Sequence, residues 1–578
     1  MVPRVRRDGG RAVSTLALAE RRLARARSAV VRAADVVESW PVPRVLGGLV
    51  AIELAAVLAL ALTVRHSGFI YYQGGDQLWH YTLGWLLGHG QLSQTQVGYG
   101  WPVVLSPIAR VFGPNLAHAF PAIVLLEVLV LLPAAMLALY GIAARIGGRL
   151  FGYWALVLWI IVPFLGIRFT NAGYHQRYTE LTLPQSFGLT AMSDFPTMVA
   201  SLVSLYFVAK VVLDRNPALV DAAAGGVAAG VAIAVKPATA LFLAGPALAF
   251  AYKRRVAGAA AFAAALAPAL VALALWKERG LGQVPLLGAP AGRPTASGAD
   301  AVDGPLAGLN LHKYINLDWN RFLTNLDLLR EHFWSARLIE WLVIAGLIGL
   351  ARRSRAAVLL VGGTFAAFVV VKGTYPNASV EDSSFFRIMM PAYPAFLLLL
   401  ASLPFLLPKA PSALRAWRPA LAPPSLRTRW SLVGATVLLS ALLPLVAFAA
   451  ARTSGSLTPA TLGHTSMPVP VDVDIGLRAT ADGRRVKLSW DDQSSFGGPV
   501  FYRVWRGARD GLTCPPATGA QLCKLVLPEV GTTKGTTYTD APRPGTWTYR
   551  VAVAANWLHD AHYGDPYLVS TPLTVTVR

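Results

Sequence analysis

Long apolar runs, separated by shorter polar segments, occupy the chain from about residue 45 to about residue 455. A membrane-spanning helix needs roughly 20 predominantly apolar residues, and about eleven runs approach or exceed that length. They lie near residues 45–65, 116–143, 150–166, 191–213, 219–234, 237–252, 256–276, 337–351, 356–372, 386–407 and 430–451. The pattern predicts a polytopic α-helical membrane domain over 45–455.

Beyond residue 470 the apolar residues alternate with polar ones instead. Such period-two runs lie at Val486–Trp490, Phe501–Trp505, Trp547–Val553 and Leu573–Val577, with turn-forming residues between them. Alternation of this kind, repeated over a region of about 100 residues, indicates an antiparallel β-sandwich. The chain is therefore expected to carry a second, all-β domain over 470–578.

The composition agrees with a membrane protein. Hydrophobic residues make up 54% of the chain, the mean hydropathy is +0.49 and charged residues make up 14%. Soluble domains usually carry about 25% charged residues. The net charge of +22 comes largely from arginine-rich segments between the spans. A nucleic-acid-binding role would need one basic face on a soluble domain, so no nucleic-acid partner is expected.

The same charges predict the topology. With about eleven spans, the Arg-rich N-terminal tail (1–44) and the basic segments at Arg145, 253–255, 352–355 and 409–429 fall on one side. The positive-inside rule places that side, with the N-terminus, in the cytoplasm and the C-terminal domain outside it. The tail is expected to lie as an amphipathic helix on anionic membrane lipids. The excess of arginine over lysine favours a bacterial plasma membrane.

The outer side then carries the longer loops, and long loops usually carry function. These loops are 66–115, 167–190, 277–336 and 373–385. In the first of them Asp76 follows Gly75 within a stretch rich in aromatic residues. Because glycine frees the backbone before it, Asp76 could reach a substrate at the water–lipid boundary. The alternative is that Asp76 only caps the helix that follows.

The cysteines and two aromatic positions refine the interpretation of the β domain. Cys514 and Cys523 are the two cysteines of the chain, and a disulfide between them suits an oxidising outer compartment. Two free thiols are the alternative. Trp490 and the Tyr549-x-Val551 run resemble the core tryptophan and the penultimate-strand signature of fibronectin type III domains. The resemblance implies a binding or positioning module.

Four short motifs of the membrane domain share an order along the chain and a predicted side. They are Gly75-Asp76 with the later Gly100-Trp101-Pro102, Ser193-Asp194-Phe195-Pro196, Val235-Lys236-Pro237, and Arg387 with Pro391-Ala392-Tyr393-Pro394. Together with the long outer loops they resemble the GT-C glycosyltransferases, in the branch of protein mannosyltransferases and aminoarabinose transferases. The chain departs from that pattern in two places, because Gln77 replaces a glutamate after Asp76 and Ile388 replaces a tyrosine after Arg387.

The resemblance implies an inverting transferase that moves a sugar from a polyprenyl-phosphate donor to an extracytoplasmic acceptor, which is an envelope glycan, a lipid or a protein. Such chemistry needs a base for the acceptor hydroxyl and cations for the leaving phosphate. Asp76 is the candidate base. The candidate substrate-binding residues are Arg168, His175, Arg177, Glu180, Asp194, Lys236, Lys372 and Arg387. Interfacial anchoring, snorkelling or helix capping is the alternative role for each of them.

No cluster of histidine, cysteine and aspartate has the spacing of a zinc site. We therefore expect no structural metal, although a divalent cation stays open as a cofactor. Two other functions compete with the transferase. A transporter or lipid flippase would show internal repeats or midplane charges, and a non-catalytic assembly factor would leave the Gly75-Asp76 loop unexplained.

Overall fold

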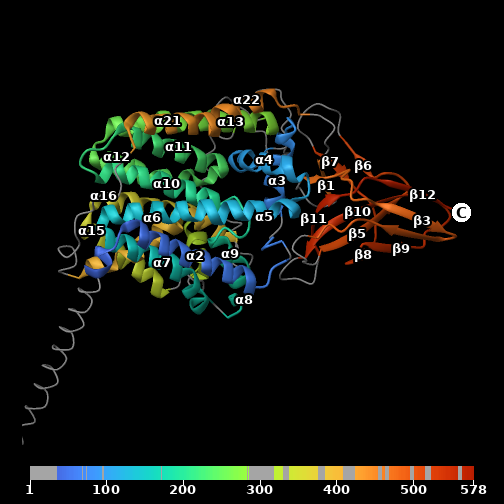
Figure 1. Ribbon diagram of the computed structural model, residues 1–578, viewed down its shortest axis with the longest axis horizontal. Helices are drawn as coiled ribbons and strands as arrows, with labels where there is room; N and C mark the ends of the chain where they lie inside the picture. The colour runs from blue at the N-terminus through green and yellow to red at the C-terminus, as the bar shows by residue number, and fades with distance from the viewer. Residues whose placement is uncertain are drawn as a thin grey trace, which may run out of the picture.

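The structure is a computed structural model in which a bundle of helices carries a β domain at one end (Figure 1). The described residues are 35–67, 69–72, 75–93, 95, 97–170, 172–282, 284, 318–329, 337–374, 384–407, 424–453, 459–462, 468–494, 500–514, 522–556 and 563–578. Most of the predicted N-terminal tail, most of loop 277–336 and most of loop 373–385 thus lie outside the described residues.

The helical part of the chain runs from α2 to α22. Its α-helices are α2 (Val42–Thr63), α3 (Gly75–Gly88), α4 (Gly100–Phe112), α5 (Leu116–Leu126), α6 (Leu132–Gly147), α7 (Arg149–Phe169), α8 (His175–Arg177), α9 (Leu183–Ser186), α10 (Asp194–Leu213), α11 (Leu219–Val235), α12 (Ala244–Lys253), α13 (Val256–Leu281), α14 (Trp319–Leu329), α15 (Arg337–Arg353), α16 (Arg355–Ala357), α17 (Gly363–Lys372), α18 (Ser384–Met389), α19 (Tyr393–Ala401), α21 (Leu426–Val437) and α22 (Leu443–Ala450).

Shorter helical turns connect several of these helices. The π-helical turns are η1 (Glu127–Leu131), η2 (Tyr178–Thr182), η6 (Val358–Gly362) and η9 (Leu438–Leu442), and the 3₁₀ turns are η3 (Pro237–Leu243), η7 (Met390–Ala392) and η8 (Leu403–Leu406). Prolines 237, 391 and 404 lie in the first two positions of the three 3₁₀ turns. A proline cannot donate a helical hydrogen bond, which explains why the apolar runs are interrupted there.

Among the described residues, eight helical segments are long and apolar enough to cross a membrane. They are Val42–Thr63, Leu116–Gly147, Arg149–Arg168, Asp194–Leu213, Val256–Leu281, Arg355–Lys372, Phe386–Leu406 and Leu426–Ala450. This confirms the predicted class, a helical polytopic membrane protein. The remaining predicted runs are shorter helices, namely α11, η3 with α12, and α15.

Successive long helices alternate in direction, so that distant parts of the chain meet at each end of the bundle (Figure 1). At the end beside the β domain, Arg452 after α22 forms a parallel bridge with Gln91. At the other end, Arg353 of α15 donates from Nε to the carbonyl oxygen of Ile146 at 2.8 Å. We name these the site end, where α2, α11 and α17 terminate, and the far end. Which end faces the cytoplasm stays a prediction of the arginine pattern.

The β domain contains three small sheets. Its strands are β1 (Pro459–Leu462), β2 (Val469–Pro470), β3 (Arg478–Asp482), β4 (Arg485–Ser489), β5 (Val500–Gly507), β6 (Leu512–Thr513), β7 (Cys523–Leu525), β8 (Glu529–Thr533), β9 (Thr537–Asp540), β10 (Gly545–Asn556), β11 (Tyr563–Val569) and β12 (Leu573–Val577). The strand orders are β3-β4-β9, β11-β10-β5-β8 with β12 also on β10, and β2-β1-β7-β6. The predicted all-β domain is confirmed.

The register of β6 and β7 explains the disulfide. Leu512 pairs with Leu525 and Thr513 pairs with Lys524 in this antiparallel ladder, so the next pair in register is Cys514 opposite Cys523. The two cysteines form the predicted disulfide. Trp490, which directly follows β4, is buried and packs against Tyr502 with 5.2 Å between ring centroids. A core role for Trp490 is thus confirmed.

The β domain packs on the chain segment that precedes Asp76. Tyr567 of β11 is fully buried and meets the ring of Phe69 edge-on at 5.2 Å between centroids. Tyr72 lies 6.5 Å from the same ring. Beside this contact, Asn115 donates from Nδ2 to Oε1 of Gln493 at 3.1 Å. The domain therefore packs against the chain segment that leads to Asp76 rather than hanging free from the bundle.

Candidate functional site

Two acids and two cations from distant parts of the chain meet at the site end. Arg387 of α18 forms one ion pair with Asp76 through Nη2 and a second with Asp194 through Nε at 3.3 Å. Lys236 forms an ion pair with the other carboxylate oxygen of Asp194. We call these four residues the charged cluster.

Local structure places both acids at the start of a helix. Asp76 lies in the first turn of α3 and Asp194 is the first residue of α10. The positive end of a helix dipole favours an anion in the first turn. The side chain of Asp194 is only 1% exposed, whereas that of Asp76 is 48% exposed. Asp76 is therefore the acid that a molecule from solution can reach.

The two cations lie where proline interrupts the helices. Lys236 follows the last residue of α11 and has an extended backbone, with φ −141° and ψ 101°. The next residue, Pro237, disfavours a helical conformation at Lys236. Arg387 lies on the short helix α18, directly before the 3₁₀ turn that contains Pro391. Each cation is thereby held at the end of a span with its side chain directed to the acids.

The electrostatics of the charged cluster favour an ionised Asp76. Burial in the surrounding protein raises the pKa of Asp76. The charges of Arg387 and Lys236 and a hydrogen bond from Arg387 lower the pKa by more than burial raises it, so the pKa lies below its ordinary value. His80, one helical turn after Asp76, is completely buried. Burial lowers the pKa of His80 to about 4, against the opposing effect of Asp76 and Asp194. The imidazole is therefore neutral at neutral pH.

The remaining candidates lie at the same end but outside the charged cluster. Lys372, at the end of α17, is close enough to Lys236 for their charges to interact. Arg168 is exposed in the last turn of α7, and Arg177 ends the short helix α8. His175 and Glu180 line a separate cavity between the end of α2 and residues 172–180. Of the eight predicted substrate-binding residues, the cluster thus includes Asp194, Lys236 and Arg387.

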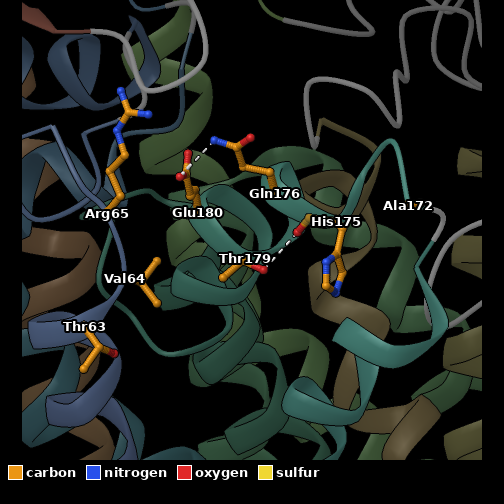
Figure 2. A pocket seen from close by; sticks show the side chains of 8 residues that line it. All are labelled: Thr63, Val64, Arg65, Ala172, His175, Gln176, Thr179 and Glu180. Carbon is orange, nitrogen blue, oxygen red and sulfur yellow. Dashed lines mark hydrogen bonds between the residues drawn. The ribbon is translucent and has the colours of Figure 1, made fainter.

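Figure 2 shows this second cavity. Arg65, on the chain that leaves α2, faces Glu180 and Gln176 across it, and the ring of His175 lies farther along. Gln176 donates from Nε2 to Oε1 of Glu180 at 3.2 Å. Glu180 therefore contributes a buried carboxylate to a polar cavity, and no ion pair joins it to the charged cluster among the described contacts.

Two buried side chains hold the segment that leads into Asp194. Gln77 donates from Nε2 to the carbonyl oxygen of Thr190, and Glu127 accepts a hydrogen bond from the backbone N–H of Ala191 at 3.1 Å. Ala191 has a left-handed backbone with φ 54°, a conformation that costs free energy outside glycine. Because a glutamate could not donate to the carbonyl of Thr190, this contact explains the glutamine after Asp76 in structural terms.

His80 and Arg65 are not among the residues singled out from the sequence, and Gln77 enters there only as a departure from the family pattern. His80 lies four positions after Asp76 on the same helix, and this spacing puts two side chains on one helix face. The spacing is the sequence signal that could have identified His80 as a neighbour of Asp76. The glutamine donor and Arg65 have no comparable pattern. Within the described part of the chain, no group of three or more histidine, cysteine, aspartate or glutamate side chains could hold a metal ion.

The comparisons with known proteins add the following. No family model matches the sequence, and no curated protein matches it. Among solved structures the chain is similar to ArnT from Cupriavidus metallidurans, a GT-C glycosyltransferase, in a crystal structure bound to undecaprenyl phosphate and in one of the apo state. Both matches have 14% identity and a TM-score of 0.37, and cover 61% of this chain and 59% of that chain.

The chain spans about 59% of the length of the ArnT chain that it matches.

Proposed function

We propose that the protein is a membrane glycosyltransferase of the GT-C type, which moves a sugar from a polyprenyl-phosphate donor to an extracytoplasmic acceptor of the cell envelope. The observation that carries the proposal is the charged cluster. An accessible carboxylate, Asp76, pairs with Arg387, and Asp194 links Arg387 to a second cation, Lys236, at the ends of membrane spans. A lipid-linked phosphate in the bilayer surface would meet both kinds of group at once.

The residues divide the chemistry between them. Asp76 takes the proton of the acceptor hydroxyl as that oxygen attacks the anomeric carbon of the sugar. The bond between this carbon and the phosphate oxygen breaks, and the electron pair leaves with the polyprenyl phosphate. Arg387 and Lys236 stabilise the charge that develops on the phosphate. Attack from the face opposite the phosphate inverts the anomeric configuration.

The ion pairs of the ligand-free protein fit this division. Arg387 is shared between Asp76 and Asp194, and Lys236 is held by Asp194. An incoming phosphate competes with the carboxylates for these cations. When Arg387 turns to the phosphate, Asp76 loses the charge that holds its pKa low and becomes a stronger base. Donor binding would thus prepare the base for the acceptor.

The acceptor class is a glycan, a lipid or a protein outside the cytoplasm, as the predicted topology requires. The β domain lies at the site end and supports the loop of Asp76 through Tyr567, which suits a module that positions the acceptor. We expect its fold to be of the fibronectin type III kind. A divalent cation is not needed for this scheme, because Arg387 and Lys236 supply the positive charge.

The test compares two aspartates, each paired with an arginine, at opposite ends of the bundle. The purified protein is offered a panel of polyprenyl-phosphate sugars with envelope extract as acceptor, and release of polyprenyl phosphate is measured. Asp76→Asn should lower turnover by about 10²–10⁴-fold, the usual contribution of a general base. The control is Asp214→Asn at the far end, where Asp214 pairs with Arg145 at 3.4 Å. Near-normal turnover of a folded Asp76→Asn variant would contradict the assignment.

A further inference from the structure

The cavity between the end of α2 and residues 172–180 is a site apart from the charged cluster. Its lining residues are Thr63, Val64, Arg65, Ala172, His175, Gln176, Thr179 and Glu180. Its volume is about 470 Å³, which falls in the usual range of 300–1,000 Å³ for small-molecule sites. Six of the eight side chains are polar, and both hydroxyl and carboxylate groups are present (Figure 2). A lining of this kind suits a polar ligand.

Glu180 supplies the specific evidence for a ligand. The residue is 6% exposed. Its Oε1 accepts the hydrogen bond from Gln176, whereas Oε2 is buried and has no hydrogen-bond partner among the described residues. Buried polar atoms are nearly always paired, and an orphan in a native structure needs a reason such as a water or a ligand. Glu180 also lies in the π-helical turn η2, a feature that is frequent at functional sites.

The cavity shares a wall with the loop that carries Asp76. Tyr71 donates from its hydroxyl to the carbonyl oxygens of Leu60 at 3.0 Å and Val64 at 3.1 Å, and Val64 lines the cavity. Gln77, the neighbour of Asp76, donates to the carbonyl oxygen of Tyr71 at 3.5 Å. Tyr71 itself has a left-handed backbone with φ 61°, and such conformations cluster at functional sites. A ligand in this cavity is therefore connected to the proposed base through Val64, Tyr71 and Gln77.

We propose that this cavity binds the carbohydrate part of the acceptor, with Glu180 accepting a hydrogen bond from a sugar hydroxyl. The inference rests on the proposed function, since it names the acceptor subsite of the same reaction. A carboxylate inside the cavity disfavours the donor phosphate, which the charged cluster is suited to hold instead. Threonine hydroxyls, the amide of Gln176 and the guanidinium of Arg65 match the mixed donors and acceptors of a neutral sugar.

The experiment measures sugar binding directly, without turnover. Methyl glycosides of neutral hexoses and pentoses are titrated into the purified full-length protein, and binding is followed by saturation-transfer NMR. We expect the wild-type protein to bind at least one of them with a Kd of roughly 1–10 mM, ordinary for a weak small-molecule contact. Glu180→Gln should weaken that binding about tenfold or more, which corresponds to the loss of a hydrogen bond to a charged group.

Two further variants keep the result interpretable. Ala172→Phe fills the cavity from an exposed position, so it should abolish binding without disturbing the fold. Glu53→Gln is the matched control, because Glu53 is also a buried carboxylate, bonded by Trp159 at 3.0 Å in the middle of α2. Its Kd should stay within about twofold of wild type. The proposal would be overturned if no glycoside bound to the wild-type protein. It would also be overturned if Glu180→Gln and Ala172→Phe bound the glycosides as tightly as the wild-type protein does.

One more variant separates this inference from the proposed function. Asp76→Asn lies outside the cavity lining and should bind the glycosides as wild type does, whatever happens to its turnover. Glycoside binding that is lost in Ala172→Phe supports the subsite even if Asp76→Asn remains an active transferase. Turnover that is lost in Asp76→Asn while no glycoside binds to the wild type supports the transferase and rejects this subsite.

Discussion

The two ends of the helix bundle both carry buried ion pairs, but they are built differently. At the far end, Asp221 is only 6% exposed and pairs with Lys210 at 2.5 Å and with Arg429. Nearby, Arg145 pairs with Asp214 at 3.4 Å. Lys210 and Asp221 are eleven positions apart in the chain, on either side of the short connection between α10 and α11. These pairs fasten neighbouring helices to each other.

At the site end the ion pairs join parts of the chain that are far apart. Arg387 and Asp76 are 311 positions apart, and Arg387 and Asp194 are 193 positions apart. At both ends one acid holds two cations, but only at the site end does one of those cations, Arg387, also pair with a second acid. The side chain of Asp76 is 48% exposed, so the pair is open to solution. The accessible carboxylate therefore distinguishes the site end from the far end, where Arg429 and Asp221 are also far apart in the chain.

The site end and the far end also differ in which ion pairs can change partners. A buried pair that loses one member leaves an uncompensated charge and is strongly destabilised, so the pairs of Asp221 are expected to be permanent. An exposed carboxylate can exchange its cation for water at small cost. The pair of Arg387 with Asp76 is therefore the one that a phosphate can open.

The largest effect concerns the support that the site end receives from the β domain and the far end does not. Tyr567→Ala removes the buried ring that meets Phe69 and Tyr72. Replacing a large buried aromatic side chain with alanine typically costs about 3–5 kcal/mol. We expect a lower melting temperature, together with reduced turnover at temperatures where the protein is still folded, because the loop of Asp76 loses its support.

Trp490→Ala is the matched control for that prediction. Trp490 is a buried aromatic residue of the same domain that packs against Tyr502, and among the ring contacts of the described residues it has none with residues 69–72. It should lower the melting temperature and leave turnover per folded molecule unchanged. If the two variants reduce turnover equally, the domain acts through its overall stability, and the specific contact with the loop is unimportant.

The second effect is a pH dependence of stability that arises at the site end. His80 has a pKa of about 4 in the folded protein against 6.5 in an ordinary environment. Between these pH values the unfolded chain binds a proton that the folded chain does not, so stability falls as the pH falls from 6.5 to 4. The contribution of His80 is fully present above pH 6.5, and the total loss is about 3 kcal/mol at 1.36 kcal/mol per pKa unit.

Thermal unfolding at pH 7 and pH 5 measures this dependence. Asp76 does not contribute in that window, because an acid whose pKa is lowered loses its stabilisation only as the pH falls below its ordinary value of 3.8. His80→Asn should flatten the curve between the two pH values. His89→Asn, at an exposed position directly after the same helix, should leave the slope in place. An unchanged slope in His80→Asn would show that another group titrates.

The sequence predicted the helices well and the site only in part. The run predicted at 150–166 is the segment Arg149–Arg168, and the run at 256–276 lies within Val256–Leu281. Apolar runs fix these elements because the bilayer demands a minimum length. The sidedness of the loops brought Arg168 and Arg177 to the correct end. It could not tell that they lie outside the charged cluster, since the position of a residue across that end depends on helix packing.

The members of the charged cluster came from motifs, but their pairing did not. The sequence makes Asp194, Lys236 and Arg387 candidate substrate ligands, with helix capping as the alternative for Asp194 and snorkelling for Lys236. That Arg387 holds two acids together is a contact that no local spacing encodes. The support of Asp76 by Tyr567 is likewise a contact between domains, so neither domain's own pattern could predict it.

The smallest effect tests the contrast itself, by removing one arginine from each end. Arg387→Ala should weaken the binding of undecaprenyl phosphate, in detergent micelles and at fixed ionic strength, by about 10–100-fold. This is the loss of a charge-assisted contact worth about 1.5–3 kcal/mol. The affinity of Arg387→Lys should fall between those of Arg387→Ala and wild type, because lysine keeps the charge and loses the paired geometry of the guanidinium.

Arg429→Ala is the control at the far end, where Lys210 still neutralises Asp221. It should leave phosphate binding unchanged and lower only the melting temperature. If both arginine variants bind undecaprenyl phosphate as wild type does, the charged cluster only holds helices together, as the ion pairs at the far end do. The donor phosphate must then be held elsewhere.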